Sequence, residues 1–320
     1  MTVYADLSKQ VTYVNSVLLK SQDMFNHNAG PGIWKAFTET QTSTSTQNTI
    51  DVLAAIPGMR KWKGAKQFHR VKAMALNTTT DDYEDSLIVP KNDFRNDKTG
   101  NINKLINGFV AKNGAFYDTF AIEALLAAAS SYCVDGVYLA SASHPYATRA
   151  GATQSNYGTT ALSLAQLDAI RILMRAYKLE GELMGVEPDT LIVGPKLERL
   201  ALEITGGDRP LAVDNSGAES GTRIGVTTVS TPTKLYRGGS MNVVVTPRFN
   251  GTYDDYFVVL DSQFPGGKPI IAVIVDDPHL VALDKETDLP RFMNNEYMWS
   301  VEANVGFFPG NPYSMYFSAV

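Results

Sequence analysis

Residues 58–97 carry many charged side chains and few large apolar ones, so this stretch cannot form a hydrophobic core of its own. Its first half, GMRKWKGAKQFHRVK, contains Lys and Arg but neither Asp nor Glu. Its second half is acidic, and the Thr, Val and Ile residues within it favour extended backbone. We therefore predict a two-stranded arm with one basic and one acidic side. An isolated hairpin is only marginally stable in water, so this arm needs a partner surface.

Three kinds of partner could meet the basic side: nucleic acid, an acidic ligand, or an acidic patch on another copy of the chain. The formal net charge of −5 argues against a protein that grips DNA with its whole surface. Trp62 and Phe68 interleave with the charges, as in surfaces that meet other surfaces.

Self-assembly through complementary patches explains the arm best. A single exposed ion pair contributes only about 0–1 kcal/mol, but many pairs repeated around a closed assembly can set register and partner choice. The predicted inter-subunit contacts are Arg60, Lys61, Trp62, Lys63, Lys66, Arg70, Asp81, Asp82, Glu84 and Asp85.

The composition is that of a globular chain of about two domains, with 320 residues of which 44% are hydrophobic. Cys133 is the one cysteine, so neither a disulfide nor a cysteine zinc site can form within one chain. The first residues lack the basic and apolar regions of a secretory signal, and no run reaches the length of a membrane span. We expect an unsecreted protein made in reducing cytoplasm, with no membrane contact.

The pattern of elements predicts an α+β fold. The polar stretch at residues 38–49 is expected to be a linker or an extended arm that orders on contact with a neighbour. Residues 115–131 form the strongest predicted helix, and a second one begins after a Ser163 cap and closes at Gly181. Residues 188–207 read as strand, turn and helix, with Pro195 at the first helical position. Short β-rich runs follow: MNVVVTP, DYFVVLD, KPIIAVIVDDP and the tail from Glu296.

Catalytic patterns are missing from the sequence. It contains no phosphate-binding glycine loop, no serine elbow and no H-E-x-x-H. The four histidines are scattered, and His144, before Pro145, is expected to bond to loop backbone. The adjacent acids Asp81–Asp82, Asp254–Asp255 and Asp276–Asp277 are more typical of strand ends and turns than of a cation site. We therefore predict no catalytic residue, no metal and no cofactor.

Several segments resemble the Mu-like phage major head subunit family. The run from Gly58 to Gly64 resembles the family's G-M-R-x-W-x-G signature, and Ile56–Pro57 precedes it as in the family. Tyr83–Glu84 and His144–Pro145 follow in order, and residues 185–204 resemble the family's P-x-x-L-V-V-P-x-x-L-E segment. The resemblance covers roughly residues 50–280.

This resemblance implies the HK97-like phage capsid fold, with an N-terminal arm, an extended E-loop, a P-domain with a long spine helix, and an A-domain. The implied limits are 1–50 for the N-terminal arm, 51–100 for the E-loop and flanking P-domain strands, 101–185 for the P-domain with its spine helix, 186–282 for the A-domain, and 283–320 for the P-domain return strands.

The implied function is that of a major capsid protein of a tailed double-stranded DNA bacteriophage or prophage, a structural protein rather than an enzyme. Its copies would form the hexamers and pentamers of an icosahedral shell, assembled in the bacterial host cytoplasm and kept in the virion. Further implied partners are scaffolding, decoration and portal proteins, and packaged DNA held without sequence-specific binding.

Two other hypotheses stay open at this point. A protein nanocompartment of the encapsulin type would share the fold and add a groove for cargo peptides. A small-molecule enzyme with an α+β core would instead show a concave pocket with convergent titratable groups.

Overall fold

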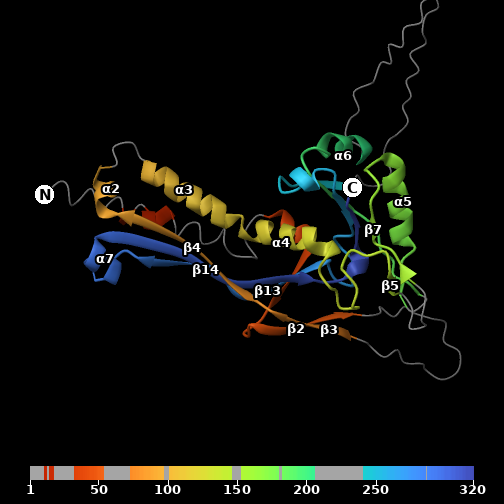
Figure 1. The fold of residues 1–320 in the computed structure, drawn as a ribbon, viewed down its shortest axis with the longest axis horizontal. Helices are drawn as coiled ribbons and strands as arrows, with labels where there is room; N and C mark the ends of the chain where they lie inside the picture. Colours follow the sequence, from red (N-terminus) through yellow and green to blue (C-terminus); the bar gives the residue numbers. More distant parts are fainter. Residues whose placement is uncertain are drawn as a thin grey trace, which may run out of the picture. The chain divides into compact units, whose positions relative to one another are not determined.

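The computed structural model describes residues 11–12, 14–17, 32–53, 73–96, 101–145, 153–179, 182–205, 241–285 and 287–320. The chain divides into two compact units (Figure 1). The first unit comprises residues 1–52, 73–134 and 269–310, and the second comprises 53–72, 135–268 and 311–320.

The first unit is built on a four-stranded sheet in the order β1-β13-β14-β4. Its strands are β1 (Thr38–Thr42), β13 (Ile270–Leu283), β14 (Glu296–Pro309) and β4 (Asp81–Pro90). β1 runs parallel to β13, and the other neighbours are antiparallel. Apolar residues alternate with polar ones along β14, so Tyr297, Trp299 and Val301 point to one buried face.

Helices α3 (Asn101–Gly114) and α4 (Phe116–Leu126) lie along that face, which we call the inner face of the sheet (Figure 1). Ile106, Phe109 and Val110 of α3 share a core cluster with Tyr297 and Trp299. The other short elements of the unit are η1 (Ile33–Ala36), α2 (Lys91–Asn96), η2 (Ala127–Ala129) and α7 (Leu289–Asn294).

The predicted arm differs from the observed strands. β2 (Gln47–Leu53) and β3 (Ala73–Thr79) form a separate two-stranded sheet, and residues 54–72 between them lie outside the described residues. The acidic half is no part of this hairpin, because β4 pairs with β14 along its whole length. The alternation of side chains along β4 explains why this strand belongs to the four-stranded sheet, because Leu87 and Val89 point to the inner face and pack on the core.

The polar stretch at residues 38–49 is extended, as predicted, but it pairs within its own chain. Thr38–Thr42 form β1 beside β13, and the next residues lead into β2. Strand pairing satisfies backbone groups whatever the side chains are, so a polar sequence can add an edge strand to an apolar sheet.

The predicted helix at residues 115–131 is α4 followed by η2, and α3 precedes it with a break at Ala115. The predicted cap of the next helix, α5 (Leu164–Arg175), is confirmed, because the Ser163 hydroxyl accepts a hydrogen bond from the Gln166 amide at 3.1 Å. This helix ends at Arg175 rather than Gly181, because β8 (Lys178–Leu179) follows it and pairs antiparallel with β9 (Glu182–Leu183).

The second unit contains a five-stranded sheet in the order β11-β10-β12-β15-β7, with α5 and α6 (Glu198–Thr205). The strands are β11 (Asn242–Val245), β10 (Thr190–Val193), β12 (Phe257–Leu260), β15 (Met315–Ser318) and β7 (Tyr157–Gly158). Smaller elements are β5 (His144–Pro145), β6 (Thr153–Gln154), η3 (Gly251–Tyr253) and η4 (Pro312–Ser314).

The β-rich runs predicted from the sequence are confirmed as β11, β12, β13 and β14. Pro195 is not at the first helical position, because it lies in a turn and α6 begins at Glu198. The domain limits implied by the resemblance stay a prediction.

Candidate assembly surfaces

The predicted contact residues divide between described and undescribed parts of the chain. Arg60, Lys61, Trp62, Lys63, Lys66 and Arg70 lie outside the described residues. Asp81, Asp82, Glu84 and Asp85 all lie on β4, one of the two edge strands of the four-stranded sheet.

The four acids of β4 do not form one surface, because successive residues of a strand point to opposite faces. Asp85 faces α3, where its carboxylate accepts a hydrogen bond from the Asn113 side chain at 3.0 Å and lies 3.6 Å from the Lys112 ammonium. Asp82 and Glu84 are exposed on the opposite face, which we call the outer face. The predicted acidic cluster is therefore split by the sheet.

Tyr83 lies on the inner face and fixes β4 against α4. Its ring centroid lies 5.1 Å from that of Phe116 and 4.5 Å from that of Phe120. Burial, with smaller contributions from the charges of Asp81 and Glu123, raises the pKa of the Tyr83 phenol. This aromatic contact holds the acidic strand in its register.

The outer face has an acidic part and an apolar part. The acidic patch consists of Asp82, Glu84, Asp276 and Glu302, whose side chains are all exposed. Further along the same face, Ile88, Met298 and Leu283 lie side by side on three neighbouring strands and form an apolar row. Ile88 is 52% exposed and Leu283 is 41% exposed.

A cluster of exposed apolar side chains lies on α7, which contacts β13 and β14. Leu289, Phe292 and Met293 are 75%, 78% and 68% exposed. Exposed apolar groups of this size, gathered on one short element, are typical of surfaces that another protein covers.

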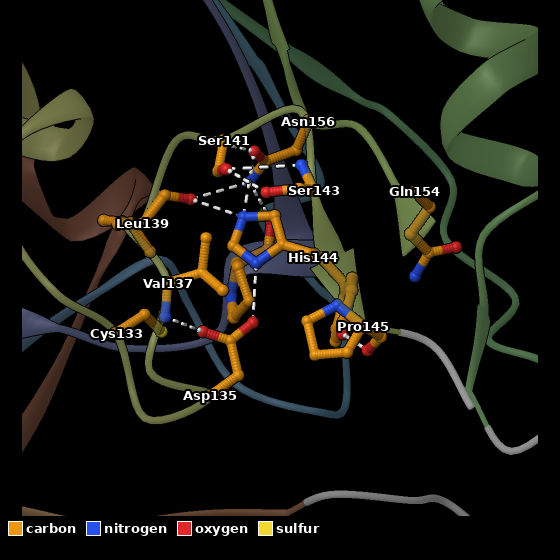
Figure 2. A network of polar contacts seen from close by, with 12 residues as sticks. Cys133, Asp135, Val137, Leu139, Ser141, Ser143, His144, Pro145, Gln154 and Asn156 are labelled. Atoms are coloured by element: carbon orange, nitrogen blue, oxygen red, sulfur yellow. Dashed lines mark hydrogen bonds and ion pairs between the residues drawn. The ribbon is translucent and has the colours of Figure 1, made fainter. Parts of the chain in front are cut away.

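A buried polar network surrounds His144 in the second unit (Figure 2). The ring is fully buried, and its Nδ1 lies 2.6 Å from a carboxylate oxygen of Asp135. Its Nε2 lies 3.2 Å from the Leu139 carbonyl oxygen and 3.1 Å from Oδ1 of Asn156. The predicted bond to loop backbone is present, but two buried side chains share the site with it.

Asn156 fixes the orientation of this network. Its amide group donates to the carbonyl oxygens of Leu139 and Pro312, both at 2.8 Å, and its Oδ1 accepts from the Ser141 amide. Oδ1 is therefore an acceptor toward the ring, so Nε2 must carry a proton. A second proton lies between Nδ1 and the Asp135 carboxylate, because two acceptors cannot bond to each other.

The network contains residue types that are common in acid–base sites, but its geometry indicates a structural role. Both ring nitrogens are bonded within the protein, and the ring has no surface for a substrate. The bonds from Asn156 to Leu139 and Pro312 connect the loop at residues 135–144 to the last residues of the chain. The network therefore positions β5 and β15 in the second unit.

Neither a metal site nor a membrane span is found in the described part of the chain. Its His, Cys, Asp and Glu residues form no group of three or more that could hold a metal ion. None of the helices there is long and apolar enough to cross a membrane.

Asp276 and Glu302 were not predicted as neighbours of the β4 acids. The alternation of apolar residues from Tyr297 to Val305 could have placed Glu302 on an outer face, but only the strand register brings it opposite Glu84. Asp135 and Asn156 were not predicted as partners of His144, because they lie nine and twelve positions from it and only the fold brings them together.

Comparison with known proteins gives one family and one fold. Residues 17–166 match the family described as Mu-like prophage major head subunit gpT, which confirms the resemblance from residue 50 to residue 166. A search of curated proteins found no match.

Two solved phage structures share the fold. A chain of the bacteriophage JBD30 procapsid has a TM-score of 0.55 and 17% identity, with 98% of this chain and 75% of that chain covered. A chain of the Microbacterium phage Oxtober96 structure has a TM-score of 0.51 and 13% identity, with 90% of each chain covered. The predicted α+β, HK97-like capsid fold is confirmed by these likenesses.

Proposed function

We propose that this chain, matched by the Mu-like major head subunit family over residues 17–166, is the major capsid protein of a tailed bacteriophage or prophage. The family match carries the proposal, and the shared fold supports it. Its role is structural: copies associate with one another into a closed shell, with hexamers and pentamers as its building blocks and double-stranded DNA inside it. The virion is its final location, and the host cytoplasm is where it assembles.

The surfaces of the first unit support self-association. The exposed side chains of α7 form an apolar surface, and the contact of such a surface with water is unfavourable in free energy. The four strands of the sheet contain neither Lys nor Arg, the side chains that usually bind DNA phosphates. A shell subunit with this face encloses DNA without binding it tightly.

The domain limits and partners implied by the resemblance are part of this proposal. We assign the segment between β2 and β3 to the E-loop, and α3 with α4 to the spine of the P-domain. Scaffolding, decoration and portal proteins are the further partners proposed for the shell. The family match favours this function over a cargo compartment or a small-molecule enzyme.

The function is tested with the purified full-length chain by size-exclusion chromatography and negative-stain electron microscopy. We expect closed particles, or rings of five and six copies. A chain that stays monomeric, both alone and when co-produced with the other head proteins encoded beside it, would contradict the proposal.

A further inference from the structure

The strands that complete both sheets come from one late stretch of the chain. In the four-stranded sheet, β13 and β14 are the two inner strands, and β1 and β4 lie at its opposite edges. In the five-stranded sheet, β15 lies between β12 and β7. These three strands lie within residues 270–318, whereas every other described strand of the two sheets ends at or before Leu260. Each unit therefore needs residues that are synthesised after its other strands.

The first unit has no sheet without these residues. Among the described residues, β1 pairs with β13 alone and β4 pairs with β14 alone, so the two edge strands do not pair with each other. Helix α3 shares a core cluster with Tyr297 and Trp299 of β14, which bury its apolar side. An isolated helix of this length is only marginally stable in water. The earlier elements of this unit therefore have no stable structure to join before β13 and β14 are present.

The second unit loses an inner strand of its sheet when the same residues are missing. β7 pairs with β15 through Tyr157 and Phe317, and it has no other partner strand in the described part of the chain. Residues 311–318 are all buried, and the side chains of Met315 and Phe317 are 0% exposed. Without them, three neighbouring strands remain, but the core beneath β12 and the pairing of β7 are lost.

The buried network around His144 depends on these residues as well. The Asn156 side chain donates a hydrogen bond to the Pro312 carbonyl oxygen at 2.8 Å. The Phe317 amide donates to the Asn156 carbonyl oxygen, also at 2.8 Å. The loop that carries His144 is therefore not fixed in place before residues 311–318 are present.

This strand order differs from the usual course of folding during synthesis, in which domains fold as units and the N-terminal one folds first. The pairs Thr38–Ile270 and Tyr157–Phe317 join residues that are far apart in the sequence. Such contacts form slowly, because the entropy of closing a long loop opposes them. The residues before 260 therefore leave the ribosome before the strands that cover their apolar side chains.

We propose that residues 270–318 control when this chain folds, so that neither unit reaches its native structure until these residues have left the ribosome. Surfaces built on the two native sheets then exist on finished chains only. Copies that are still being synthesised on one messenger RNA therefore do not associate through incomplete sheets. The folding order follows from the strand order alone, whereas its consequence for association rests on the proposed shell function.

Full-length chains stalled on the ribosome test this order. An arrest sequence is fused after Val320, behind one of two spacers. The short spacer keeps β15 and the end of β14 inside the exit tunnel, and the long spacer places both strands outside it. Amide hydrogen exchange of the ribosome-bound chains is then measured by mass spectrometry. Peptides from residues 81–90, 101–114 and 153–158 should exchange at least about tenfold more slowly with the long spacer.

Two substitutions in the long-spacer chain separate the effect of β15 from that of the nearby ribosome. Phe317→Asp places a charge at a buried position of β15 and should return residues 153–158 to fast exchange. Val320→Asp, at a residue that is 44% exposed, should leave the exchange of these peptides unchanged.

Equally slow exchange with the two spacers would show that both units fold without these strands and would overturn the proposal. Equally fast exchange would also overturn it, because release from the ribosome rather than the presence of residues 270–318 would then start folding. The measurement is made on single ribosome-bound chains and does not depend on particles. A chain with the expected exchange that never forms particles would contradict the shell function and leave the folding order standing.

Discussion

Replacing His144 with alanine is expected to lower the free energy of unfolding of the second unit by about 3 kcal/mol, near the upper end of the cost of leaving a buried polar group without its hydrogen-bond partner. The substitution removes the ring that contacts the Asp135 carboxylate, whose side chain is only 4% exposed. It also removes the donor that the Leu139 carbonyl and Asn156 share. The loop at residues 135–144 then loses part of its connection to the end of the chain.

Amide hydrogen exchange with mass spectrometry measures this effect locally. Peptides from residues 135–145 and 153–158 should exchange about 10²-fold faster in the variant, since each 1.4 kcal/mol corresponds to a factor of ten. His279→Ala is the matched control, because the side chain of that histidine is 41% exposed and its replacement should change exchange little. Equal exchange in the two variants would show that the buried network does not stabilise the unit.

Replacing Trp299 with alanine should destabilise the first unit by about 3–5 kcal/mol, the typical cost of removing a large buried aromatic side chain. Trp299 is 1% exposed and stacks on Tyr297 with 6.0 Å between ring centroids. Its ring nitrogen also donates to Asn15 at 3.2 Å. The variant would leave a cavity between β14 and α3, at the place where the Trp299 side chain packs the sheet against the helix.

Urea unfolding followed by far-ultraviolet circular dichroism measures this loss. Trp299→Phe keeps most of the apolar volume and should cost clearly less than the alanine variant. Met298→Ala, on the outer face of the same strand, should cost less than either, because Met298 is only half-buried. A Trp299→Ala midpoint equal to that of Met298→Ala would contradict the placement of the core.

The elements that were predicted correctly are those whose sequence pattern lies within a few consecutive residues. The Ser163 cap and the β-rich runs were found because capping and alternation act over a few residues. The acidic strand was assigned to the wrong pairing, because its partner β14 lies more than 200 positions away and nothing local records that register. Helix α3 was not predicted from its residues, because its several Asn and Gly residues have low helix propensity.

The candidate surfaces were predictable in composition but not in arrangement. The basic segment and the acids of β4 were visible as charge runs, and both were assigned to a contact between copies. Successive side chains of β4 point to opposite faces of the sheet, so Asp85 lies beside Asn113 on one face and Glu84 lies beside Glu302 on the other. Sequence patterns report which side chains are present, whereas strand register decides which of them meet.

Cryo-electron microscopy of particles purified from cells that produce the full-length chain tests the central claim most directly. We predict a closed icosahedral wall that is built from copies of this fold. Particles whose wall lacks this fold, or a chain that remains monomeric even with its companion head proteins, would contradict it.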